Sequence, residues 1–69
     1  MRMVPVSSSN LNSVGYDENT QTLRIDFHNG TYDYYNVPRS VYDGLLNASS
    51  KGQFHHNYIK NDFRNNRIG

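Results

Sequence analysis

Apolar and polar residues alternate with a period of two from Leu23 to Tyr35, on both sides of an Asn29-Gly30 pair. Such alternation is typical of β-strands with one buried face. Asn-Gly favours a two-residue hairpin turn in which both turn residues have positive φ. Folding the chain about this turn sets Phe27 opposite Tyr32. The segment therefore predicts a hairpin with one apolar face, which other elements must cover.

The second face of this hairpin is polar. The same register places Arg24 opposite Tyr35 and Asp26 opposite Asp33. Two carboxylates directly opposite each other destabilise a strand pair, so we expect a cation to compensate them. Arg24, on the diagonal, is one candidate, and the basic tail of a second subunit is the other. The outer face of the sheet is therefore also a candidate subunit interface.

A third strand is predicted over residues 11–16, ahead of the hairpin. Pairing Tyr16 with Gln21 across a turn sets Val14 opposite Leu23, which makes a three-stranded antiparallel meander. Strand alternation gives this meander one core face of seven residues: Val14, Tyr16, Leu23, Ile25, Phe27, Tyr32 and Tyr34.

Two short helices are predicted after the sheet. Pro38 suits the first position of a helix over residues 38–48. The apolar stripe of this helix consists of Val41, Tyr42, Leu45 and Leu46. Ser50 stands three residues before Gln53, the spacing of a capping box, which predicts a second helix over residues 51–61.

Residues 62–69 lack helical periodicity and are predicted to form an irregular basic tail. The order β-β-β-α-α indicates the α+β class, with a three-stranded antiparallel meander and two short helices packed on one face. Because the sequence is short and contains no repeat, residues 1–69 are expected to form one domain.

The chain has 69 residues and no cysteine, so disulfides and thiolate zinc sites are excluded. A domain of this size buries only about 60% of the surface that its unfolded chain exposes. Its stability is therefore marginal, and we expect a homo-oligomer. No apolar run has the length of a signal peptide or a membrane span, so a cytoplasmic protein without membrane contact is expected.

Positive charge is concentrated near the end of the sequence. Residues 1–50 carry three arginines against five acidic residues, a net charge of −2, whereas residues 51–69 carry four cations against one aspartate, a net charge of +3. Duplex nucleic-acid binders neutralise many phosphates along a longer stripe. This patch provides for one or two phosphates.

Ser50-Lys51-Gly52 stands where the second helix begins. Unpaired backbone N–H groups, a hydroxyl, an ammonium group and a glycine meet there, as they do around a bound phosphate. Lys60 and Arg64 would neutralise further charge. The alternative is an ordinary capped helix start with a solvated lysine.

Further candidate ligand contacts are polar or aromatic. Ser8, Ser9 and Asn10 offer hydroxyls and an amide that can read sugars and base edges, although such residues are also common where a first strand begins. Tyr35 or His55 could stack on a base.

The sequence offers no catalytic set. It shows neither a nucleophile beside a base nor a metal motif, so a non-enzymatic protein without cofactor or metal is expected. His55 and His56 are adjacent and would point about 100° apart on a helix, which disfavours chelation. Tyr32 and Tyr34 could form a stacking platform, but their place on the core face favours packing under the helices.

The order of several motifs resembles the KTSC domain, a family named for its occurrence at the C-terminus of some lysyl-tRNA synthetases and also found as free-standing bacterial and phage proteins. The motifs are Val6-Ser7-Ser8-Ser9-Asn10, Val14-Gly15-Tyr16-Asp17, Tyr32-x-Tyr34 followed by Tyr35-Asn36-Val37-Pro38, Ser50-Lys51-Gly52 and Ile59-Lys60. Where the family often has two adjacent aromatic residues, this chain has Phe54-His55, which would alter a site built on the second ring. The resemblance implies the fold, and its synthetase-linked members suggest RNA binding.

These observations favour a non-enzymatic binder of a small nucleotide. A free-standing protein of this kind could act as a phage-type sponge that removes a cyclic nucleotide immune signal from solution. One alternative is a module that binds single-stranded RNA or tRNA through the same cations. A second alternative is a protein-binding adaptor or inhibitor that uses the outer sheet face.

Overall fold

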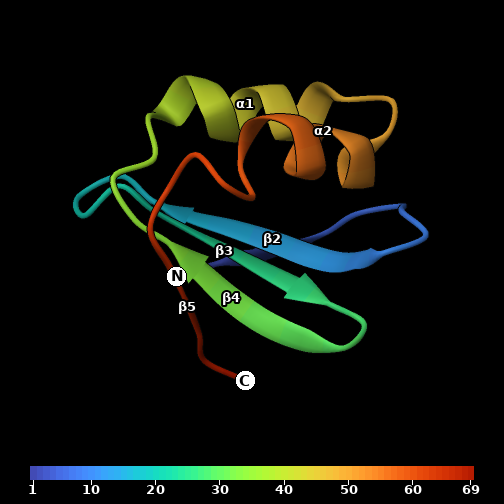
Figure 1. The fold of residues 1–69 in the computed structure, drawn as a ribbon, viewed down its shortest axis with the longest axis horizontal. Helices are drawn as coiled ribbons and strands as arrows, with labels where there is room; N and C mark the ends of the chain where they lie inside the picture. The colour runs from blue at the N-terminus through green and yellow to red at the C-terminus, as the bar shows by residue number, and fades with distance from the viewer.

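One antiparallel sheet, with its strands in chain order, forms the base of the computed structural model, which describes residues 1–69. Both helices lie on one face of the sheet (Figure 1). The elements are β1 (Met3–Pro5), β2 (Leu11–Asp17), β3 (Thr22–Phe27), β4 (Gly30–Tyr34), α1 (Arg39–Asn47), α2 (Lys51–Tyr58) and β5 (Asn65–Arg67). The predicted α+β class and the one-sided helix layer are confirmed, but the sheet has five strands rather than three.

The two additional strands, β1 and β5, are the outer strands of the sheet. β1 pairs with β2 through Val4 opposite Val14, and β5 pairs with β4 through Asn66 opposite Asp33. The prediction of an irregular tail over residues 62–69 is therefore wrong. Each outer strand has three residues and no buried side chain. Such strands lack the buried alternation that reveals a strand in a sequence.

Both hairpin turns lie one residue away from their predicted positions. In the β3–β4 hairpin, Phe27 pairs with Gly30, so His28 and Asn29 form the turn. Asn29 does not have positive φ, and the predicted Asn29-Gly30 turn geometry is wrong. The β2–β3 turn moves in the other direction and ends at Gln21, whose φ is 55°. Because each turn keeps its length, each register shifts by two residues and the seven predicted core residues keep their face. Leu11 differs from its prediction: strand alternation places it on the outer face, but a register shift between Leu11 and Ser13 turns its side chain into the core, where it is 1% exposed.

The register shift removes the expected repulsion on the outer face. Arg24 lies opposite Asp33, and its guanidinium donates to both carboxylate oxygens, at 2.7 and 3.0 Å. This hydrogen bond raises the pKa of Arg24. Asp26 lies opposite Thr31 and accepts its hydroxyl at 2.9 Å. The predicted Asp26–Asp33 pair is therefore wrong, whereas compensation by Arg24 is confirmed. Tyr35 follows the end of β4 and does not pair with Arg24.

The core lies between the sheet and the helices. All seven residues of the predicted core face belong to the core cluster or pack against it, with Tyr16, Phe27 and Tyr32 only partly buried. The nine buried core residues are Leu11, Val14, Leu23, Ile25, Tyr34, Val37, Tyr42, Leu45 and Ile59.

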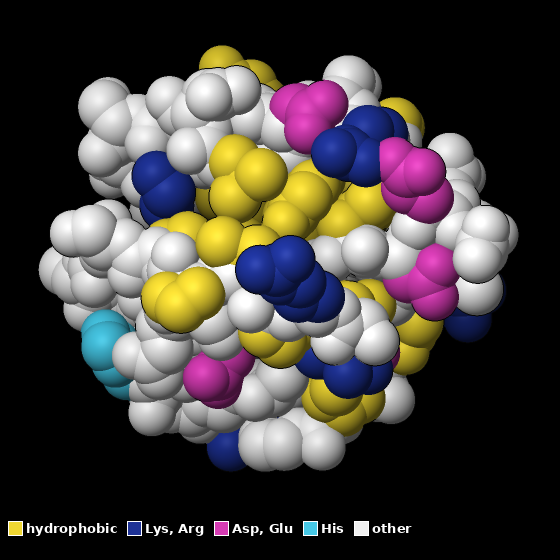
Figure 2. Space-filling view, turned by 180° about the vertical axis from the view of Figure 1, so that it is seen from behind, with side chains coloured by type: hydrophobic (Ala, Val, Ile, Leu, Met, Phe, Trp, Pro, Cys, Tyr) yellow, Lys and Arg dark blue, Asp and Glu magenta, His cyan; other side chains and the backbone are white.

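Ring stacking and ion pairs join α1 to the β2–β3 hairpin. The rings of Tyr16 and Tyr42 stack with centroids 5.1 Å apart. Arg39 lies over both rings and pairs with Glu18 and Asp43. Figure 2 shows hydrophobic side chains exposed on the rear of the molecule, with basic and acidic side chains along their border.

Both helices begin close to their predicted starts. Pro38 precedes α1 as its N-cap residue rather than occupying the first helical position. Ser50 caps α2, and its hydroxyl oxygen accepts the backbone N–H of Gln53. α2 is three residues shorter than predicted, because the backbone leaves the helix at Ile59, whose side chain is fully buried in the core. Neither helix is long and apolar enough to cross a membrane.

Candidate functional site

Three cavities adjoin one another where the helix layer meets the segment before β2 and the β3–β4 turn. The serine cavity, of about 380 Å³, is lined by Ser7, Ser8, Ser9, Ser49, Ser50 and Lys51. The asparagine cavity, of about 360 Å³, is lined by Asn10, Phe27, His28, Asn29, Gly52 and His55. The tyrosine cavity, of about 490 Å³, is lined by Phe27, Asn29, Tyr32, Tyr34, His55, Lys60, Asn61 and Asn65.

Phe27, Asn29 and His55 line both the asparagine cavity and the tyrosine cavity, which are therefore neighbours. The serine cavity ends at Ser9 and Lys51, and the next residues in the chain, Asn10 and Gly52, belong to the asparagine cavity. The contact of Asn10 with Gly52 lies at the boundary between these two cavities, and the three cavities together are called the cavity row.

Most of the predicted ligand residues meet in this row. Ser8, Ser9, Ser50 and Lys51 line the serine cavity, and Asn10, Gly52 and His55 line the asparagine cavity. Lys60 joins His55 in the tyrosine cavity.

Two predicted residues, Tyr35 and Arg64, line none of the three cavities. Their backbones are joined instead, because the N–H of Tyr35 donates to the carbonyl of Arg64 at 2.9 Å. Of the two ring residues predicted as ligand contacts, the structure therefore brings only His55 to the other candidates.

Serine hydroxyls in the serine cavity are oriented by backbone N–H groups. Ser8 Oγ accepts the N–H groups of Asn10 and Leu11, at 3.2 and 3.3 Å, and Ser50 Oγ accepts that of Gln53. A hydroxyl whose oxygen accepts in this way keeps its O–H as a donor for a ligand. The Lys51 ammonium donates to the carbonyl of Ala48 at 3.0 Å, which leaves it further donors.

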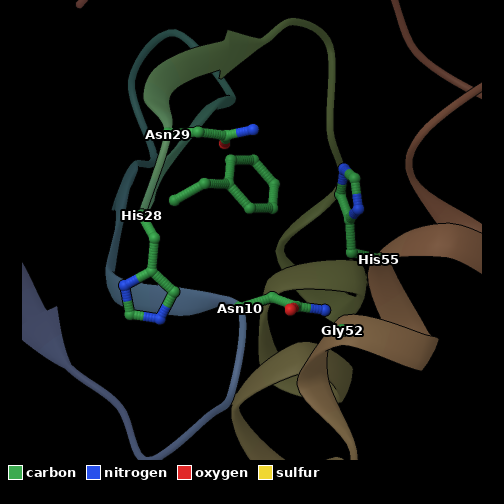
Figure 3. A pocket seen from close by; sticks show the side chains of 6 residues that line it. Asn10, His28, Asn29, Gly52 and His55 are labelled. Atoms are coloured by element: carbon green, nitrogen blue, oxygen red, sulfur yellow. The ribbon is translucent and has the colours of Figure 1, made fainter.

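The junction between the serine and asparagine cavities is a close contact of α2 with the segment before β2. A Cβ atom on Gly52 would lie 2.8 Å from Nδ2 of Asn10, so a larger residue would displace this amide. The carbonyl of Asn10 accepts the N–H of His28 at 3.2 Å. Figure 3 shows Asn10 and Asn29 on opposite sides of the asparagine cavity, with His55 extending from α2 beside it.

His55 is held between two aromatic side chains. Its Nε2 lies 2.7 Å from the hydroxyl oxygen of Tyr34, and its ring packs edge-on against Phe27 and Tyr34, with centroids 4.8 and 5.6 Å away. Burial lowers the pKa of His55 to about 4, with smaller contributions from Lys60 and His56. Burial also raises the pKa of Tyr34 to about 12. Both groups are therefore neutral near pH 7.

Aromatic rings, amides and one ammonium group line the tyrosine cavity. Tyr32 packs edge-on against Phe27, with centroids 5.9 Å apart. Lys60 is the cation of this cavity, and no aspartate or glutamate lines any of the three. Flat apolar walls, neutral hydrogen-bonding groups and cations suit a ligand that combines a heterocycle with an anionic group.

Several lining residues were not predicted as ligand contacts. The sequence signal for Tyr32 and Tyr34 is their alternation on one strand, which suits a stacking platform. In the structure both residues pack in the core and also line the tyrosine cavity. No sequence signal marks Asn61 or Asn65 as a ligand contact. The pattern predicts Asn61 as the last residue of a helix, and it does not predict strand β5, in which Asn65 lies. Asn29 was assigned to a turn, and its position between two cavities depends on the helices.

Comparison with known proteins identifies the family. The model of the KTSC domain matches residues 7–63, and the chain belongs to this family, as its motifs predicted. A crystal structure of a KTSC domain protein from Yersinia pestis is 40% identical and superposes with a TM-score of 0.96, covering 99% of this chain and 97% of that chain.

Relatives include both short proteins and parts of enzymes. A protein from Tsukamurella paurometabola is 46% identical over 63 residues, which cover 90% of this chain and 94% of the relative. A lysine-tRNA ligase from Nostoc sp. is 46% identical over 50 residues, which cover 71% of this chain and 9% of the ligase.

Proposed function

We propose that this member of the KTSC family is a non-enzymatic binding module for a small nucleotide. The observation that carries the proposal is the row of cavities, in which an aromatic wall lies between two lysines and no carboxylate is present. A phosphate is favoured where cations and donors meet without acidic groups. A base is favoured where aromatic rings and amides meet.

Each cavity has a separate role in this proposal. The base packs against Phe27 and His55, where contact of one base with aromatic rings contributes about 1–3 kcal/mol. Asn10 and Asn29 offer amide groups to the base edges. A phosphate lies in the serine cavity, where it receives the hydroxyls of Ser8, Ser9 and Ser50 and the ammonium of Lys51. Lys60 neutralises charge at the opposite end.

A sponge is the biological role that fits such a module when it is free-standing. The Tsukamurella relative is matched over nearly its whole length, so a KTSC domain occurs as almost an entire protein. A protein of this kind would act by lowering the free concentration of its ligand. Cyclic nucleotide immune signals combine bases with phosphates, which is the chemistry that the cavity row offers.

RNA binding is the second candidate, and the similarity to lysine-tRNA ligases favours it. In that case Lys51, Lys60 and Arg64 would contact phosphates along a single strand. Arg64 lines none of the three cavities but belongs to the basic end of the chain. Its side chain should therefore contribute to RNA binding but not to binding of a small nucleotide.

The test begins with the unmodified protein and a panel of linear and cyclic nucleotides, together with a short single-stranded RNA. A ligand at a hundred times its Kd should raise the Tm by about 10 °C or more, given a domain of this size. Exchanging Lys60 for glutamine should raise the Kd for the bound nucleotide about tenfold, since one charge-assisted contact is lost. Arg64→Gln is the matched control and should leave the Kd unchanged.

Salt dependence of the Kd distinguishes the two candidates. A cavity that holds one or two phosphates should give a shallow dependence, whereas contacts along a strand should give a steep one. Binding of RNA alone, weakened equally by Lys60→Gln and Arg64→Gln, would favour the second candidate. Absence of binding to every nucleotide and to the RNA would reject both and direct the search to protein partners.

A further inference from the structure

We infer that β5 forms a specificity-determining wall of the tyrosine cavity, and that Arg67 positions Asn29 in the same cavity. This inference rests on the proposed function, because it concerns how the same site selects its nucleotide. β5 and Arg67 follow residue 63, where the match to the family model ends.

The Arg67 side chain connects β5 to the β3–β4 turn. Its Nη2 donates to the backbone carbonyl of Asn29 at 2.9 Å, and its Nε donates to the carbonyl of Gly69 at 2.9 Å. Gly30 makes this contact possible, because a Cβ atom there would lie 2.9 Å from Nε and 3.0 Å from Cζ of Arg67. Gly30 also has a φ of 156°, which residues with a side chain rarely adopt.

The residue that Arg67 holds lies at the centre of the site. Asn29 lines both the asparagine cavity and the tyrosine cavity. Asn65, which lies in β5 together with Arg67, adds a second amide to the lining of the tyrosine cavity. Two of the amides available to a base therefore depend on where β5 lies.

β5 is held by its ladder to β4 and by backbone hydrogen bonds of Arg64, Ile68 and Gly69, and no side chain of the strand is buried. All three of its residues are exposed, and Ile68, which follows it, is 45% exposed. Its ladder to β4 is extended by Ile68, whose N–H donates to the carbonyl of Thr31 at 2.8 Å. An exposed edge strand of this kind opens more easily than the core. The contact of Arg67 with Asn29 is the side-chain hydrogen bond that joins this strand to the β3–β4 turn.

The test exchanges Arg67 for methionine in the full chain, which keeps an extended apolar side chain over Gly30 and removes the guanidinium. The best nucleotide of the panel should bind about threefold to tenfold more weakly, because Asn29 loses a charged donor on its carbonyl. The ratio of Kd values for nucleotides that differ only in their base should change as well. Arg64→Met is the matched control and should change neither quantity.

A conservative variant separates positioning from a general loss of structure. Arg67→Lys keeps a donor that can reach a carbonyl, and it should restore the base preference of the unmodified protein. An equal loss of affinity for every base in Arg67→Met, with a lowered Tm, would show a structural role and overturn the inference. An unchanged Kd in a protein that does bind nucleotides would overturn it as well. If the unmodified protein binds no nucleotide, the proposed function fails first and this inference fails with it.

Discussion

Exchange of Ile25 for alanine is expected to remove a large share of the free energy of unfolding. Ile25 lies in the central strand β3, between Val14 of β2 and Tyr32 of β4, and its side chain is 0% exposed. Loss of a buried isoleucine in this way costs about 2–5 kcal/mol. A domain of 69 residues has a free energy of unfolding of about 3–10 kcal/mol in total.

Urea unfolding followed by circular dichroism measures this loss. Val4→Ala is the control, since Val4 lies in the edge strand β1 and is 37% exposed. The free energy of unfolding of this variant should differ from that of the unmodified protein by less than about 1 kcal/mol. A midpoint for Ile25→Ala equal to that of Val4→Ala would contradict the assignment of β3 to the centre of the core.

The second large effect is a loss of stability as the pH falls from 6.5 towards 4. Burial lowers the pKa of His55 from 6.5 to about 4 in the folded protein. Between these values the unfolded chain binds more protons than the folded chain, so acid favours unfolding. The contribution of neutral His55 to the free energy of unfolding is complete above pH 6.5. It decreases as the pH falls below 6.5 and levels off near pH 4. Because His55 is only half-buried, solvent screening reduces the expected loss to about 1–2 kcal/mol.

The measurement is the free energy of unfolding in urea at several pH values, compared between variants. His55→Gln removes the titrating group but keeps a polar partner for the Tyr34 hydroxyl, so the slope between pH 6.5 and 4.5 should become shallower. His56→Gln is the matched control, because His56 is adjacent and exposed, and it should retain the slope. Equal slopes in both variants would show that His55 is not buried in a neutral form.

The two hairpins show what a periodic pattern can and cannot predict. The alternation assigned Val14, Leu23, Ile25 and Tyr34 to one face, and all four are buried in the core. The pairing partners were wrong by two residues in both hairpins. A shift of one residue would have exchanged the two faces, which the burial of apolar side chains opposes, whereas a shift of two keeps them.

Outer-face charges decided between two registers that are equivalent for the core. The predicted register places two carboxylates opposite each other, whereas the observed register places Arg24 opposite Asp33 and Asp26 opposite Thr31. The repulsion between Asp26 and Asp33 was recognised in the sequence as unfavourable. Cross-strand pairing on the outer face therefore favours the observed register, whereas burial of the core side chains does not distinguish the two.

The candidate site was predicted from local features, and only part of it is local. Ser50 and Lys51 belong to the start of a helix, a position that the capping pattern reveals. Phe27 was assigned to the core, yet it is only partly buried and lines two cavities. Its ring packs against His55 of α2, so its exposure depends on where this helix lies on the sheet.

The sequence by itself determined the α+β class, the apolar face of the central strands, the starts of both helices and the family, because each depends on residues close together in the chain. Only the tertiary structure decided the registers, the outer strands β1 and β5, the pairing of Arg24 with Asp33, and the row of cavities. The β4–β5 pairing and the cavity row join segments that are far apart in the sequence, whereas the registers of the two hairpins depend on which cross-strand pairs fit the rest of the sheet. The free energy of the β4–β5 pairing and of the cavity row comes from contacts between distant segments, which no local pattern records.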